Sequence, residues 1–130
     1  MLFRSVEHKR WMGAEYTRRL QEIDELELQV EEPWARSVFW MYGVVVKERT
    51  GLDAVEFAKR LQQLGVQTRP FFLGMHEQPV FHQRGWFRGE KHPVAERLAR
   101  QGLYLPSGTA LTEEQLNKTV AAVQQALRLR

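Results

Sequence analysis

The chain has 130 residues, of which 43% are hydrophobic and 11% aromatic, a length and composition that suit one globular domain and exclude a largely disordered chain. It contains no cysteine, which excludes a disulfide scaffold and a thiolate metal site and fits a cytoplasmic protein. The 19 basic and 16 acidic residues are mixed along the chain and leave a net charge of +3, a pattern typical of a solvated surface rather than a nucleic-acid groove. The longest apolar run, residues 38–46, is too short to cross a bilayer.

The first third of the sequence predicts a helix, a loop and a strand. Apolar residues at helical spacing indicate a helix over residues 5–22. Residues 25–33 are acidic and end in a proline, so we expect a loop there with room for one extended stretch. Residues 37–47 are rich in aromatic and β-branched side chains, which predicts a buried strand with Trp40 in the core.

A second helix is bounded by capping residues. Asp53 followed three residues later by Glu56 has the spacing of a capping box and marks the start of this helix. Gly65 ends it, because a residue in the left-handed conformation commonly follows a helix and glycine adopts that conformation most easily. Residues 66–69 then predict a short strand that leads into an irregular segment.

The last third predicts two helices around one brief strand. Residues 82–92 are polar and lack an apolar period, so we expect a mobile segment. Pro93 starts a helix, and Gly102 ends it just before a strand at residues 103–105. Thr112 with Gln115 predicts the cap of a final helix. The order of elements indicates an α+β fold, in which helices pack against a small sheet, and a single domain over residues 1–130.

The most informative segment is residues 68–81, which read Thr-Arg-Pro-Phe-Phe-Leu-Gly-Met-His-Glu-Gln-Pro-Val-Phe. Pro70 and Pro79 prevent a continuous helix, and Gly74 loosens the middle. The result is a stiff aromatic loop that carries several polar groups. Aromatic faces with a few convergent polar groups are typical of small-molecule sites.

Three further stretches follow in a recognisable order, and they read Pro-Val-Ala-Glu from residue 93, Gly-Leu-Tyr-Leu-Pro-Ser-Gly from residue 102 and Leu-Thr-Glu-Glu-Gln from residue 111. Together with residues 68–81, and with Arg10, Tyr16 and Leu20 in the first helix, they resemble the C-terminal small domain of the DegT/DnrJ/EryC1/StrS family of PLP-dependent nucleotide-sugar aminotransferases. The Tyr-Leu-Pro-Ser-Gly sequence is most similar to that of the perosamine synthase branch. The resemblance covers nearly all of this chain, but only about the last third of a complete family member.

The resemblance implies a small, mostly antiparallel sheet packed against helices, as in the C-terminal domain of fold-type I aminotransferases. It also implies PLP in the complete enzyme, which moves an amino group from glutamate to a 4-keto-6-deoxy nucleotide sugar for O-antigen or other polysaccharide biosynthesis. The Schiff-base lysine and phosphate cup of the family belong to a large domain that this chain lacks. None of the lysines here has the family's Ser-x-x-Lys context. We therefore expect no cofactor and no catalytic residue in this chain.

Within residues 68–81, we identify candidate substrate-binding residues by type. They are Arg69, Phe72, His76, Gln78 and Phe81. A guanidinium suits paired phosphate oxygens, and the aromatic rings can wall a sugar or a nucleotide. Each side chain also has a structural interpretation, in which the polar groups form hydrogen bonds that hold the loop and the rings pack in the core. The residues leave both readings open, although Phe71 is expected in the core.

Other sites and partners are less well supported by the sequence. His76, His82 and His92 match no familiar metal-ligand spacing, and Ser107 lacks the setting of a nucleophile. The alternative to a domain of a sugar aminotransferase is a stand-alone binding or oligomerisation module derived from that family. We expect a homo-oligomer that buries the apolar residues of the first helix, around Leu2, Phe3, Val6 and Trp11, and no membrane or nucleic-acid partner.

Overall fold

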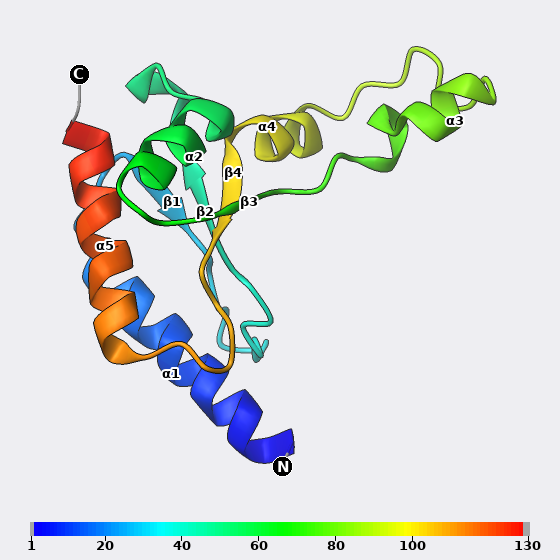
Figure 1. The fold of residues 1–130 in the computed structure, drawn as a ribbon. Helices are drawn as coiled ribbons and strands as arrows, with labels where there is room; N and C mark the ends of the chain where they lie inside the picture. Colours follow the sequence, from blue (N-terminus) through cyan, green and yellow to red (C-terminus); the bar gives the residue numbers. More distant parts are fainter. Residues whose placement is uncertain (1, 129–130) are drawn as a thin grey trace.

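The computed structural model of the chain describes residues 2–128, and side chains from residue 4 onward. Within that range, an antiparallel sheet with strand order β1–β2–β4–β3 is packed against helices (Figure 1). The strands are β1 Leu26–Leu28, β2 Tyr42–Val46, β3 Arg69–Pro70 and β4 Gly102–Leu105. The longer helices are α1 Leu2–Leu20, α2 Ala54–Gln63, α4 Pro93–Gln101 and α5 Glu113–Arg128. This arrangement confirms the predicted α+β class and the antiparallel sheet.

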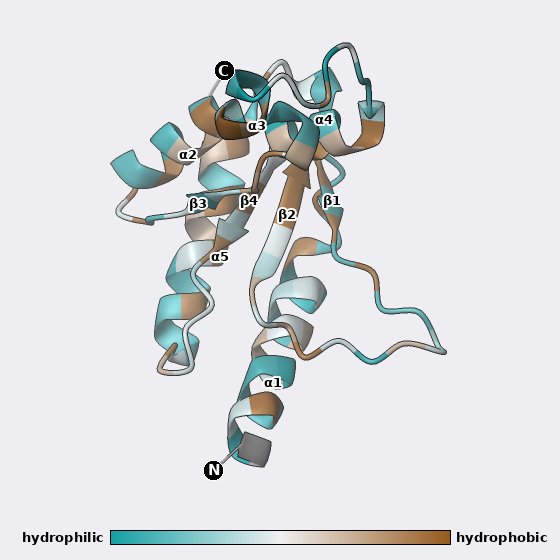
Figure 2. Ribbon diagram, turned by 90° about the vertical axis from the view of Figure 1, so that its right-hand side faces the viewer, coloured by the Kyte–Doolittle hydropathy of each residue, from teal (hydrophilic) through white to brown (hydrophobic). Residues whose placement is uncertain are grey.

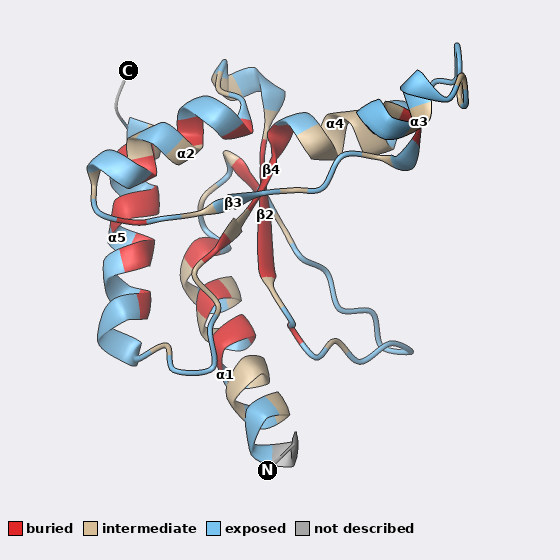
Figure 3. Cartoon of the chain, turned by 45° about the vertical axis from the view of Figure 1, so that its right-hand side comes forward, coloured by how far each residue is buried: buried red, intermediate tan, exposed pale blue. Residues whose placement is uncertain are grey.

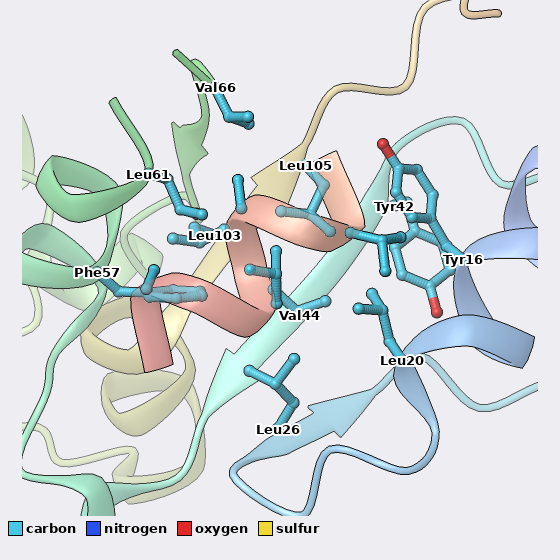
Figure 4. Close-up of a cluster of buried hydrophobic side chains, with 14 of the residues drawn as sticks. Tyr16, Leu20, Leu26, Tyr42, Val44, Phe57, Leu61, Val66, Leu103 and Leu105 are labelled. Carbon is cyan, nitrogen blue, oxygen red and sulfur yellow. The ribbon is translucent and has the colours of Figure 1, made fainter. Parts of the chain in front are cut away.

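The main core lies between one face of the sheet and the helices α1, α2 and α5 (Figure 4). Tyr42, Val44 and Val46 alternate along β2 and point into this core, as side chains of period two must. They meet apolar side chains that include Tyr16, Leu20, Phe57, Leu61 and Leu116. Burying a large apolar side chain stabilises the fold by roughly 1.5–3 kcal/mol. Figure 2 shows the corresponding contrast between the hydrophobic C-terminal half of β2 and the largely hydrophilic helices α1 and α5.

The opposite face of the sheet is closed by Phe71, which follows β3. A Cβ atom on Gly102 would lie 2.2 Å from the Phe71 ring, and one on Gly43 would lie 2.8 Å from it. The ring also packs against Tyr104, with 4.6 Å between the ring centroids. Glycines on the neighbouring strands β2 and β4 therefore make the room into which Phe71 fits, so Phe71 fills a packing role although it is only partly buried.

The predicted strand over residues 37–47 is wrong in its first half, because β2 begins at Tyr42. Phe39 has a φ of 46°, a left-handed conformation that no strand accommodates. This conformation lays the Phe39 ring against α1, where a Cβ atom on Gly13 would lie 2.5 Å from it. Phe39 takes the buried position expected for Trp40, and Trp40 is 66% exposed.

The predicted helix caps are confirmed where the structure gives their hydrogen bonds. The Asp53 carboxylate accepts from the Glu56 N–H at 2.8 Å. Thr112 and Gln115 form a complete capping box, in which the Gln115 N–H donates to the Thr112 hydroxyl oxygen and the Thr112 N–H to the Gln115 side chain. Gly65 adopts a φ of 79° after α2, as expected. Pro93 occupies the first turn of α4.

Residues 71–92 form an arm that leaves the sheet after β3 and returns to α4 (Figure 1). It contains a 3-10 turn at Met75–Glu77 and a short helix, α3, at Pro79–Gln83. Much of the arm is exposed, in contrast to the buried strand β2 (Figure 3). The helix α3 extends two residues into the segment 82–92, whose mobility stays a prediction. Between residues 2 and 128, no helix is long and apolar enough to cross a membrane.

Candidate functional site

A hollow of about 1160 Å³ opens beside β3 and β4. Its walls come from the end of the loop before β2, from residues 65–72, from residues 104–108 and from the first turns of α5. These segments are far apart in the sequence and meet because β3 and β4 are neighbours and α5 packs against α2. The hollow therefore combines the predicted aromatic loop with the turn that follows β4.

The turn after β4 is fixed to α1 by two side chains. The Tyr16 hydroxyl donates to the Pro106 carbonyl at 2.8 Å. The Lys9 ammonium donates to the Trp40 carbonyl at 2.8 Å and to the Ser107 carbonyl. Burial raises the pKa of Tyr16 to about 12 and lowers the pKa of Lys9. The Lys9 contacts join two segments that line the hollow, at Trp40 and at Ser107, to α1.

A second link holds the loop of residues 29–41 against α1. The Arg10 guanidinium donates to both oxygens of Glu31, at 2.7 and 3.0 Å, and also to the Ser37 carbonyl. Glu31 in turn accepts from the Ser37 N–H at 2.6 Å. The hydrogen bonds from Arg10, and next from Ser37, lower the pKa of Glu31 to about 2. These contacts position the end of the loop, and with it Trp40, at the hollow.

Arg69 and Phe72, predicted from the sequence as substrate-binding residues, both line the hollow. Arg69 lies on the edge strand β3, opposite Tyr104 of β4. It is exposed, and no hydrogen bond or ion pair joins its guanidinium to any residue that the structure describes. The Phe72 side chain is 69% exposed, and its ring centroid lies 6.0 Å from that of Tyr104. The geometry leaves both side chains free to meet a ligand.

His76 lies at the base of the arm and does not line the hollow. It is 7% exposed, and its Nε2 is 3.1 Å from Oε1 of Glu96 on α4. Hydrogen bonds from the His92 N–H first, and from His76 next, lower the pKa of Glu96. His82 Nε2 also contacts the His76 carbonyl. Within residues 2–128, no group of three or more His, Asp or Glu residues is arranged to hold a metal ion.

Gln78 and Phe81 also lie on the arm, outside the lining of the hollow. The Gln78 side-chain amide donates to the Leu73 carbonyl at 3.1 Å. The Phe81 ring stacks on Trp86 at a centroid distance of 5.5 Å and meets the Phe87 ring edge-on at 5.6 Å. These contacts fit the structural reading of both residues. A role in substrate binding stays a prediction for His76, Gln78 and Phe81.

Several residues of the hollow were not predicted from the sequence. Tyr104 and Ser107 belong to the Tyr-Leu-Pro-Ser-Gly stretch and line the hollow. This stretch contributes to the family resemblance, and no ligand contact was predicted for it from the sequence. Lys118 of α5 also lines the hollow, and no local pattern marks it out. It reaches the site only because α5 packs along α2, a contact between distant parts of the chain.

The family model for the DegT/DnrJ/EryC1/StrS aminotransferase family matches residues 2–124. The chain belongs to this family. It is 34% identical over 92 residues to a GDP-perosamine synthase of Caulobacter vibrioides, covering 71% of this chain and 24% of that protein. It is 25% identical over 111 residues to a GDP-perosamine synthase of Escherichia coli O157:H7, covering 85% and 28%.

The solved structures of this family agree with the fold. The chain superimposes on DesV of S. venezuelae, crystallised with a ketimine intermediate, with a TM-score of 0.82 and 25% identity, covering 96% of this chain and 32% of DesV. The aminotransferase PseC of Helicobacter pylori gives a TM-score of 0.82 at 12% identity, covering 94% and 32%, and supports the fold alone. The chain spans about a quarter to a third of the length of the curated family members it matches.

Proposed function

We propose that this chain is the C-terminal small domain of a nucleotide-sugar aminotransferase similar to the perosamine synthases. In the complete enzyme, an amino group would pass from glutamate to the keto group of a 4-keto-6-deoxy nucleotide sugar. The observation that carries the proposal is the family match over residues 2–124, joined to the similarity with two GDP-perosamine synthases. The match to about a quarter of their length, 24% and 28%, supports the assignment to one domain.

The residues of the hollow do not fit PLP, which the family implies for the complete enzyme. A PLP site needs a lysine for the Schiff base, a carboxylate against the pyridine nitrogen and a cup for the phosphate. Lys118 lines the hollow, but no Asp or Glu does so among the described residues. Lys9 is engaged by two backbone carbonyls. The cofactor would therefore be held by another part of the enzyme.

The contribution of this domain would be to bind and orient the nucleotide sugar. Arg69 carries an unpaired guanidinium, a group that binds phosphate oxygens in a fork. Phe72 and Trp40 expose their rings at the same hollow, where they can stack on a base or a sugar face. His76, Gln78 and Phe81 would shape the arm beside this site. Partners would be the nucleotide sugar and further copies of the chain in the cytoplasm, without membrane or nucleic acid.

A spectroscopic titration tests the assignment of PLP to another domain. With PLP added, the 130-residue chain should show no internal-aldimine band in the visible range and no amino transfer from glutamate. A stable band that disappears when one lysine, such as Lys118, is replaced by glutamine would contradict the proposal.

The DNA directly upstream separates this function from the alternative of a stand-alone module. We expect an in-frame domain that carries the Schiff-base lysine. In the enzyme that contains it, Arg69→Gln should raise the KM for the nucleotide sugar about tenfold, which corresponds to one charge-assisted contact. An upstream region without such a domain would favour the binding or oligomerisation module.

A further inference from the structure

The hollow beside β3 and β4 is lined by two cations and by no acid among the described residues. The cations are Arg69 on β3 and Lys118 on α5. Some basic residues elsewhere in the chain pair with carboxylates across elements, as Arg10 does with Glu31 and Arg97 with Glu27. Neither Arg69 nor Lys118 has such a partner among residues 2–128. Two cations that lack carboxylate partners and line the same concave site can bind an anion.

Two nearby groups carry negative or partial negative charge, and Lys118 forms no hydrogen bond or ion pair with either among the described residues. The first is the C-terminal end of α2, because Lys118 Nζ would lie 3.5 Å from a Cβ atom on Gly65. The carbonyls there already accept hydrogen bonds from the N–H groups of Leu64, Gly65 and Val66, and Lys118 donates to none of them. The second is Glu114, one turn earlier on α5, which forms no ion pair with Lys118 in the described part of the chain.

Neutral side-chain donors also line the hollow. Gln67 and Thr68 precede Arg69, and Ser107 lies in the turn after β4. The Ser107 carbonyl is held by Lys9, while its hydroxyl has no hydrogen-bond partner among the described residues. Hydroxyl and amide donors beside cations suit the several oxygens of a phosphate group better than a single carboxylate.

We propose that Lys118 and Arg69 form a seat for a phosphate-bearing ligand at this hollow, with Lys118 as a binding residue. The phosphate could belong to a free anion or to the diphosphate of a nucleotide sugar, and in the second case the inference rests on the proposed function. Arg69 presents a planar fork and Lys118 a compact point charge, so together they can hold neighbouring phosphate groups.

The test titrates the 130-residue chain with inorganic pyrophosphate by calorimetry at low ionic strength. Lys118→Gln and Arg69→Gln should each weaken binding about tenfold, since each removes a charge-assisted contact. Lys59→Gln makes the same charge change at an exposed position of α2 outside the hollow, so it should leave the affinity within about twofold. Raising the salt concentration should weaken wild-type binding. Absence of pyrophosphate binding, or equal effects of Lys118→Gln and Lys59→Gln, would overturn the proposal.

A second titration with a nucleoside diphosphate sugar separates this proposal from the proposed function. If pyrophosphate binds through Lys118 but the nucleotide sugar does not bind, the phosphate seat stands and the nucleotide-sugar function loses support. If the nucleotide sugar binds with an affinity that Lys118→Gln leaves unchanged, the seat is refuted while the proposed function stands. Circular dichroism of each variant verifies that the fold is retained.

Discussion

At the scale of single residues, Gly102 has no room for a larger side chain. A Cβ atom there would lie 2.2 Å from the Phe71 ring and 2.6 Å from the Leu98 carbonyl oxygen. Moving the Phe71 ring would uncover Gly43 and Gly102 on the second face of the sheet, and the Leu98 oxygen belongs to the backbone of α4. Gly102→Ala should therefore lower the free energy of unfolding by roughly 1–3 kcal/mol, as overpacking does. Urea denaturation measures the change.

Gly108 supplies the matched control for this substitution. A Cβ atom on Gly108 would meet no atom within 4 Å, and its φ is not in the left-handed region. Gly108→Ala should change the free energy of unfolding by no more than about 0.5 kcal/mol. Equal effects of the two substitutions would show that crowding under Phe71 does not limit residue 102.

Glu31 gives a residue-scale prediction about pH. Its pKa is lowered from 4.5 to about 2 by Arg10 and by the Ser37 N–H. Because the folded pKa lies below the ordinary value, the stabilisation is fully present above about pH 4.5 and is lost as the pH falls through about 2. Wild type should be more stable than Glu31→Gln at pH 6, and the difference should shrink on acidification. A difference in denaturation midpoints that does not depend on pH would contradict this role.

At the scale of elements, the sequence predicted features that are set locally. The caps at Asp53 and Thr112 and the left-handed Gly65 depend on neighbouring residues alone, and the structure contains all three. The start of β2 depends instead on Phe39 packing against Gly13 of a distant helix, so residue composition alone placed the strand too early. The same limit applies to Lys118, whose position in the hollow follows from the docking of α5.

Residues 68–81 and residues 82–92 should differ in mobility. The first segment contains β3, and the Phe71 N–H donates to the Gly102 carbonyl at 3.2 Å. The buried His76 then anchors the segment to Glu96. Residues 82–92 contain glycines at positions 85 and 89. Amide hydrogen exchange should therefore be slower in the Phe71–Glu77 stretch than in residues 84–91. The reverse order of protection would contradict the prediction.

At the scale of the whole molecule, the fold class and the family could be predicted from the sequence, whereas the shape of the site could not. The Tyr-Leu-Pro-Ser-Gly stretch and residues 68–81 mark the segments that meet. Which of their side chains share a hollow depends on the strand order β2–β4–β3. That order brings Arg69 beside Tyr104, whereas His76 contacts Glu96 of α4 and does not line the hollow. The candidate substrate-binding residues of one contiguous loop therefore lie in two places, some in the hollow and some on the arm.

The last prediction concerns self-association through α1. The N-terminal end of this helix extends beyond the sheet (Figure 1), and Trp11 there is 37% exposed. Val6 is partly buried, and the side chains of Leu2 and Phe3 lie outside the described residues. Removing a large apolar side chain from water is worth roughly 1.5–3 kcal/mol when the burial is complete. We therefore expect a homodimer or larger oligomer that buries this end of α1.

Sedimentation of wild type, of Val6→Ser combined with Trp11→Ser, and of Trp34→Ser decides whether α1 carries this contact. Trp34 is 85% exposed on the loop before β2, so its replacement removes an exposed ring from this loop and leaves α1 unchanged. The α1 variant should shift the chain toward monomer at concentrations where Trp34→Ser still associates. A wild type that is monomeric at high concentration would refute self-association. If both variants lose self-association equally, the prediction that α1 carries the contact is wrong. An interface built on α1 should depend on Trp11 and not on Trp34.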